Sequence, residues 1–94
     1  MISIYKYTLE INDKQELELP HNAVILSVAN QHESIVLYAM IDTKEEEKQD
    51  AYEIYIHGTG HEISVEERNN AVFLGTVKLL DGKIMFHVFY RKVR

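Results

Sequence analysis

The chain has 94 residues, of which 46% are hydrophobic and 27% charged, and this predicts one globular domain over residues 1–94 rather than two domains or a disordered chain. The formal charge of −5 argues against general nucleic-acid binding, because phosphate contacts need an excess of lysine and arginine. The absence of cysteine excludes disulfides, thiolate metal sites and cysteine catalysis, so core packing alone must stabilise the fold.

Alternation of apolar and polar residues predicts a hairpin at the start of the chain. Its two strands flank a polar turn at residues 12–14. We expect Leu9 to lie opposite Leu17 and Tyr7 opposite Leu19, because this pairing keeps the large apolar side chains on one face.

A second hairpin is predicted from residues 24–30 and 35–42, joined by polar residues 31–34. Both arms carry apolar side chains on both faces, and such strands are normally covered twice. Two arrangements satisfy this: the strands form the centre of a barrel or sandwich, or a second subunit covers one face. We therefore expect a homo-oligomer, most simply a two-fold dimer.

Residues 43–50 form the one charge run and have no apolar face, which predicts a solvated loop or a short frayed helix. The alternative is an acidic contact patch for a basic partner. The next strand alternates again and is expected to be half-buried. Its residues fall on two faces, Tyr52, Ile54 and Ile56 on one and Glu53, Tyr55 and His57 on the other.

This strand runs into the turn Gly58-Thr59-Gly60, which His57 and His61 bracket. Glycines free backbone amides, and loops on a rigid sheet often carry binding groups, so the turn is the candidate ligand or partner site. His87 joins it if the last hairpin packs alongside. Two alternatives involve no ligand. The glycines only provide positive φ for a corner, and the histidines only cap turns. Three imidazoles in this spacing are not a known zinc signature, so no metal is expected.

Other candidate chemistry around this turn is weak. Glu62, Glu66 and Glu67 have no apolar pocket to shift a pKa, and we expect them to be solvated. No serine has a base beside it in the sequence, so no enzyme and no cofactor are predicted. Ser64 and Glu67 have the spacing of a capping box, which predicts a helical turn near residues 65–69.

The last hairpin is predicted from Asp81-Gly82, the favoured pair for a two-residue type I′ turn. On its apolar face the expected pairs are Leu79 with Ile84, Val77 with Phe86, Gly75 with Val88, and Phe73 with Tyr90. On its mixed face, expected to be partly exposed or an interface, they are Lys78 with Met85, Thr76 with His87, and Leu74 with Phe89. The basic residues Arg91, Lys92 and Arg94 are expected to form a solvated end.

The patterns together predict an all-β domain of about seven antiparallel strands. We expect a small barrel or a two-layer sandwich with at most one short helical turn.

Several short motifs, in this order, resemble a family of small, uncharacterised proteins encoded by bacteriophages and prophages. They are Tyr5-Lys6-Tyr7, Leu19-Pro20, Ile25-Leu26-Ser27-Val28, Gly58-Thr59-Gly60-His61, Leu74-Gly75-Thr76-Val77 and Phe86-His87-Val88-Phe89. The resemblance covers nearly the whole chain and implies a phage accessory protein. It brings no established catalytic residues.

The expected function is a non-enzymatic binding protein that acts in the cytoplasm of an infected bacterial host. No apolar run is long enough for a membrane span, so no membrane partner is expected. The favoured partner is a host protein that the chain inhibits or modulates, in anti-defence or host takeover. The alternative is a sponge for a small anionic nucleotide signal. A small hydrolase and a purely structural accessory protein are further alternatives.

Overall fold

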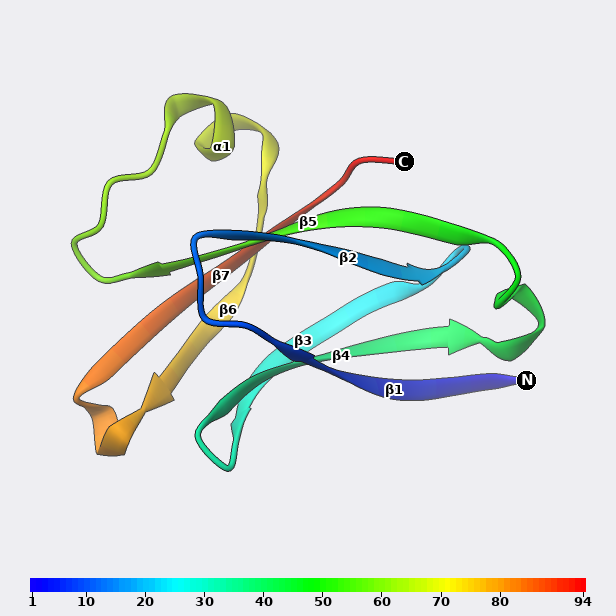
Figure 1. Cartoon of the computed structure of the whole chain (residues 1–94), viewed down its shortest axis with the longest axis horizontal. Coiled ribbons are helices and arrows are strands. Elements are labelled where there is room, and N and C mark those ends of the chain that lie inside the picture. Colours follow the sequence, from blue (N-terminus) through cyan, green and yellow to red (C-terminus); the bar gives the residue numbers. More distant parts are fainter.

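The computed structural model describes all 94 residues and contains seven strands in two sheets (Figure 1). The strands are β1 (Ile2–Leu9), β2 (Lys14–Pro20), β3 (Val24–Gln31), β4 (Ser34–Asp42), β5 (Gln49–Gly58), β6 (Val72–Leu79) and β7 (Ile84–Lys92). The helical pieces are α1 (Val65–Asn70) and the 3₁₀ turns η1 (Thr43–Glu45) and η2 (Leu80–Gly82). No helix is long and apolar enough to cross a membrane.

The two sheets form a two-layer sandwich, which is one of the two predicted architectures. One sheet has the strand order β1-β4-β3 and the other β2-β5-β7-β6, and every pairing is antiparallel. No ladder joins the sheets, so the alternative of a closed barrel is wrong. The prediction of about seven strands with a short helical turn after Ser64 is confirmed, and η1 lies in the segment predicted as a loop or a short helix.

The core lies between the sheets and is built from alternate residues of β4, β5 and β6, with one residue each from β1, β2 and β7. The three-stranded sheet contributes Leu9, Ile35, Leu37, Ala39 and Ile41. The four-stranded sheet contributes Leu19, Tyr52, Ile54, Ile56, Val77, Leu79 and Val88. Burial of each large aliphatic side chain stabilises the fold by about 1.5 to 3 kcal/mol, which makes this layer the main source of stability.

The predicted first hairpin is wrong, because β1 and β2 belong to different sheets. Leu9 lies opposite Ile35 on β4, and Leu17 lies opposite Tyr52 on β5. The chain changes sheets after β1, where Gln15 donates to the Glu10 carbonyl at 2.6 Å. Because the chain changes sheets, the half-apolar strands β1 and β2 pair with different partners. These partners, β4 and β5, are the two most buried strands. Each sheet then covers the core with one apolar face.

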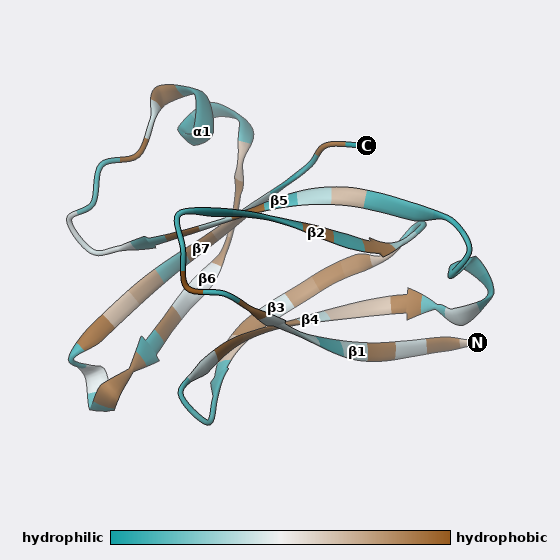
Figure 2. Ribbon diagram, viewed as in Figure 1, coloured by the Kyte–Doolittle hydropathy of each residue, from teal (hydrophilic) through white to brown (hydrophobic).

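The second predicted hairpin is confirmed, since β3 pairs with β4 around the connection at residues 32–33. The inner face of β4 contacts the opposite sheet, while the outer face of this sheet leaves apolar side chains exposed. They are Ile2, Ile4, Val24 and Leu26. Figure 2 shows brown, hydrophobic colour along β3 and β4 and mostly teal around α1. No partner chain is present, and the dimer stays a prediction.

The last hairpin has the predicted register near its turn and a different one farther away. The pairs formed by Leu79, Val77 and Gly75 are confirmed, as are those formed by Lys78 and Thr76. A bulge between Phe73 and Gly75 then shifts the ladder. The predicted pairs of Phe73 with Tyr90 and of Leu74 with Phe89 are therefore wrong: Phe73 lies opposite Phe89, and Val72 lies opposite Tyr90.

Replacing Gly82 by Val is expected to lower the free energy of unfolding by about 1 to 3 kcal/mol. Asp81 has φ 57° and Gly82 has φ 86°, and Lys83 N donates to Leu80 O at 3.1 Å, as a type I′ turn requires. A β-branched side chain resists positive φ, whereas asparagine tolerates it. Urea unfolding of Gly82→Val and the control Gly82→Asn measures the cost. Equal stability of Gly82→Val and the wild type would contradict it.

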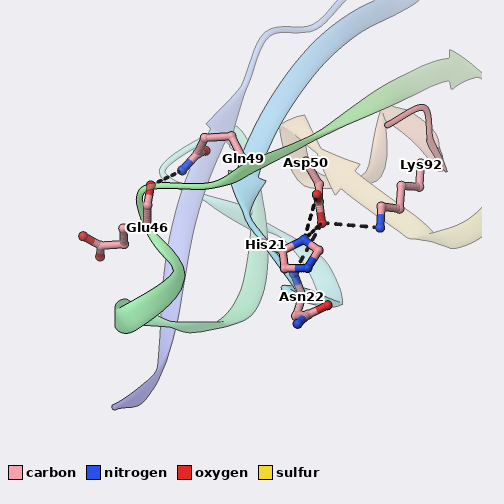
Figure 3. A network of polar contacts seen from close by, with 6 residues as sticks. All are labelled: His21, Asn22, Glu46, Gln49, Asp50 and Lys92. Carbon is pink, nitrogen blue, oxygen red and sulfur yellow. Dashed lines mark hydrogen bonds and ion pairs between the residues drawn. The ribbon is translucent and has the colours of Figure 1, made fainter.

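Residues 43–50 are not wholly a loop, because η1 occupies their start and β5 begins at Gln49. Asp50 is buried and lies 3.1 Å from Nδ1 of His21, and it also accepts from the amide of Asn22 (Figure 3). These hydrogen bonds, that of His21 first, lower the pKa of Asp50. Lys92 completes the cluster with an ion pair of 3.4 Å. The network ties the turn after β2 to the beginning of β5 and the end of β7.

The prediction of a solvated basic end is confirmed for Lys92 and Arg94, which are exposed, and is wrong for Arg91, which is partly buried. Lys92 pairs with Asp50, Arg94 pairs with Glu16 at 3.3 Å, and Arg91 pairs with a carboxylate on β5 described below. The pairing arises because β7 lies in the middle of its sheet, so its end is surrounded by acidic residues of β2 and β5.

Candidate functional site

The segment between β5 and β6, which contains α1, loops out from these strands (Figure 1), and its residues line a pocket together with residues of the four-stranded sheet. The pocket has a volume of about 520 Å³. The floor is made by strand residues, namely Lys14, Tyr55, His57 and Arg91. The covering segment also explains why β5 is buried on both faces instead of half-buried, with Tyr55 only 8% and His57 only 7% exposed.

The floor of the pocket is fixed by Glu53. Its carboxylate accepts from Lys14 Nζ at 2.8 Å, from the Tyr55 hydroxyl at 2.7 Å and from Arg91 Nη2 at 2.5 Å. These contacts, led by Lys14, lower the pKa of Glu53 from 4.5 to about 2. Burial raises the pKa of Tyr55, which keeps its hydroxyl a donor. Both cations of the pocket are therefore held by one carboxylate.

Glu67 joins α1 to the sheet. Ser64 Oγ accepts from Glu67 N at 3.0 Å, which confirms the predicted N-cap of α1. The carboxylate of Glu67 does not return to Ser64 as in a full capping box. It lies 2.6 Å from Nε2 of His57 instead, and both side chains are about nine-tenths buried. The prediction that Glu67 is solvated is wrong, because its partner lies across the pocket on β5.

The glycine turn is closed by contacts between Gly58 and His61. His61 N donates to Gly58 O, and Gly58 N donates to His61 Nδ1, both at 3.2 Å. Only Gly60 has positive φ, at 91°. Gly58 is required for another reason, since a Cβ there would lie 3.0 Å from the His61 ring. Two amides of the turn are thus already used, which weakens its interpretation as a phosphate cradle.

His87 anchors the turn to the neighbouring strands. Its Nε2 lies 2.8 Å from Thr59 Oγ1, and its Nδ1 lies 3.0 Å from Thr76 Oγ1. The structure brings no three histidine or acidic side chains together in an arrangement that could hold a metal ion. The predicted residues therefore divide: His57 and His61 line the pocket, whereas Thr59 and His87 hold the turn in place.

Four residues of the site were not among the residues predicted to bind. They are Lys14, Glu53, Tyr55 and Arg91. Alternation placed Glu53 and Tyr55 on the face of His57, and this signal was available. Lys14 and Arg91 join them through pairings of β5 with β2 and β7, which no local pattern encodes.

The pocket combines an imidazole, several carboxylates and hydrogen-bond donors. A carboxylate-oriented imidazole is an arrangement that general bases use. However, no hydroxyl is hydrogen-bonded to His57, and the Ser64 hydroxyl is occupied by an amide of α1. What remains is a polar recess with fixed donors on its floor and carboxylates on its rim.

Comparison with known proteins identifies a family whose function is unknown. No curated protein and no solved structure matches the chain. A family model described as a domain of unknown function matches residues 1–94. Because this match spans the entire sequence, the chain belongs to the family Domain of unknown function (DUF7352).

Proposed function

We propose that this chain is a non-enzymatic binding protein, encoded by a bacteriophage or prophage, that contacts a host protein through the pocket beneath α1. The observation that carries the proposal is the pocket itself. Its floor is pre-organised by Glu53 and by the contact of His57 with Glu67, while no hydroxyl is hydrogen-bonded to His57. Groups fixed before binding lose little entropy on association, which favours a recognition site.

Exposed apolar residues that neighbour the pocket residues in the chain favour a protein partner over a free nucleotide. Ile63 and Val65, on either side of Ser64, are 41% and 68% exposed. Val72 and Phe73, which follow α1, are more than half exposed. Protein interfaces combine apolar contact area with hydrogen-bonding groups in this way. A nucleotide sponge would instead need free cations, and Lys14 and Arg91 are both paired with Glu53.

His61→Ala and Thr59→Val are expected to weaken partner binding more than they weaken the fold. The first removes the ring that packs on Gly58, and the second removes the contact with His87, while both glycines remain. The immobilised wild type captures the partner from a bacterial lysate, and the purified partner is then titrated against each variant. We expect a tenfold or larger loss of affinity with melting temperatures within about 2 °C of the wild type.

The matched control is Thr8→Val on β1, an exposed threonine far from the pocket in the strand order. It should bind as the wild type does. If both turn variants bind with wild-type affinity, residues 58–61 are only a structural corner. The binding surface would then be sought on the mixed face formed by Lys78, Met85 and His87.

A further inference from the structure

We propose that a second copy of this chain binds along the free edge of β1. The β1 strands of the two copies pair antiparallel about a two-fold axis at Tyr5, and the two three-stranded sheets become one continuous sheet. The pocket beneath α1 is lined by residues of the other sheet and its connections, so dimer formation and partner binding can be measured separately.

Three of the four edge strands are protected against pairing with another strand. The edges of β3 and β6 close on each other, and Asn30 Nδ2 of β3 donates to Lys78 O of β6 at 2.9 Å. The edge strand β2 has alternate charged side chains and a terminal proline, which are common devices against edge pairing. These residues are Lys14, Glu16, Glu18 and Pro20. Only β1 has no such protection.

β1 is exposed and largely apolar. Ile2 and Ile4 are both 61% exposed, and Tyr5 is 42% exposed. The one charged side chain of the strand, Lys6, reaches across the sheet instead of along the edge, and its Nζ lies 2.5 Å from Oε1 of Gln31 on β3. Figure 1 shows β1 at the margin of the molecule, beside the N-terminus. A long apolar edge strand of this kind is a template for pairing with another chain.

The backbone groups of the free edge follow from the pairing of β1 with β4. Met1 O accepts from Thr43 N at 2.9 Å, and the register of β1 on β4 then continues without a shift. In an antiparallel ladder, successive residues direct their N–H and C=O groups alternately towards the partner strand and away from it. The residues whose backbone groups are directed away from β4 are therefore Ile2, Ile4, Lys6 and Thr8.

The free edge of β1 is complementary to itself. Because side chains alternate between the faces of a strand, a two-fold axis brings like faces together only where it passes a residue. An axis at Tyr5 pairs residues 2–8 of both copies and sets Lys6 opposite Ile4 of the second copy. An axis at Lys6 would instead set two like charges opposite each other, which is destabilising. Tyr5 directs its own N–H and C=O to β4, so the free groups on both sides of it form the new ladder.

This pairing also covers the exposed side chains of β1. On the outer face, Ile4 lies diagonal to Ile4 of the second copy, a spacing at which large side chains still make contact. On the inner face, the two Tyr5 rings lie directly opposite each other. A ladder of this length buries on the order of 1,000 Å² in total, which is the low end of specific interfaces, so we expect a dimer that forms in the micromolar range.

Cysteine cross-linking tests the register, because the chain has no cysteine of its own. Tyr5→Cys places two thiols in a non-hydrogen-bonded pair with Cα atoms about 4.5 Å apart, which is within the range of a disulfide. We expect a disulfide-linked dimer under mild oxidation, detected by non-reducing electrophoresis and mass spectrometry. The control Ser3→Cys lies on the same face of the same strand, but its two Cα atoms would be about 13 Å apart, so it should not cross-link.

Sedimentation velocity at micromolar to submillimolar concentration tests the contact itself, and the wild type should change from monomer to dimer. Ile4→Lys faces Lys6 of the second copy at two symmetric places and should weaken the dimer about tenfold. Ile4→Glu faces the same lysine with the opposite charge and should retain the dimer. The exchanged pair Ile4→Lys/Lys6→Glu should restore it. Thermal unfolding by circular dichroism shows that each variant is folded.

Four results would overturn the inference. The first is a wild type that sediments as a monomer over the whole range, and the second is equal cross-linking of Tyr5→Cys and Ser3→Cys. The third is equal dissociation by Ile4→Lys and Ile4→Glu, which would assign the contact to the apolar outer face instead of the edge. The fourth is a disulfide between Tyr5→Cys and a captured host protein in place of the dimer. Partner capture through the pocket in any of these cases would leave the proposed function unaffected.

Discussion

Acidification from pH 6 to pH 2.5 is expected to lower the free energy of unfolding, with a contribution of about 2 kcal/mol from Glu53 alone. Its pKa is 4.5 in the unfolded chain and about 2 in the fold, so the folded state holds the proton less tightly. The stabilisation is therefore fully present above pH 4.5 and is lost as the pH falls towards 2. The full shift corresponds to about 3 kcal/mol, which we reduce because Lys14 is 60% exposed and water screens the pair.

Glu53→Gln isolates this contribution. At pH 6 the variant should be less stable than the wild type by about 2 kcal/mol, and at pH 2.5 the two should converge. Urea unfolding at both pH values measures the difference. Glu18→Gln, on an exposed carboxylate of β2, is the control and should cost less than about 0.5 kcal/mol at pH 6. An equal difference in the free energy of unfolding between the wild type and Glu53→Gln at both pH values would contradict this explanation.

Leu37→Ala is expected to lower the free energy of unfolding by about 2 to 5 kcal/mol. Leu37 is fully buried on β4, between Tyr7 of β1 and Val28 of β3. The substitution leaves a cavity in the layer between the sheets, which the paired neighbours cannot close. A domain of this length has roughly 5 to 14 kcal/mol of stability in total, so the loss is a large part of it.

Leu26→Ala is the matched control, because Leu26 is 41% exposed on the neighbouring strand β3. It should cost less than about 1 kcal/mol. Thermal and urea unfolding followed by circular dichroism give both values. Similar costs for the two variants would mean that the core does not lie where the structure places it.

Sequence alone was sufficient for the parts of the fold that depend on local pattern. The β3–β4 hairpin follows from two apolar runs around a short polar connection, the β6–β7 hairpin follows from Asp81-Gly82, and Ser64 marks the start of α1. The pairing of β1 with β4 and of β2 with β5 does not follow, because alternation states which face is apolar and not which strand lies alongside. No local pattern marks the bulge before Gly75, a position that packs closely on the other sheet, where a Cβ would lie 3.0 Å from Val28 Cγ1.

In the candidate site, too, the residues marked by a local pattern were predicted and those paired with distant residues were not. His57 and His61 were found because the glycine turn stands out in the sequence. Glu67 was taken for a solvated residue because its partner belongs to another element across the pocket. Arg91 was assigned to a solvated end because its partner Glu53 is 38 positions away in the chain. Charged residues read singly appear solvated, and only the fold reveals which of them are paired.

The position of β7 has a consequence for biosynthesis. It is the last of the seven strands to leave the ribosome, yet it lies between β5 and β6 in the four-stranded sheet. Until β7 emerges, β5 has an unpaired edge and β6 has no partner in its sheet, while the three-stranded sheet can already form from β1, β3 and β4. Nascent chains that stop before β7 thus expose an apolar strand edge of the kind that chaperones recognise and that aggregates form upon.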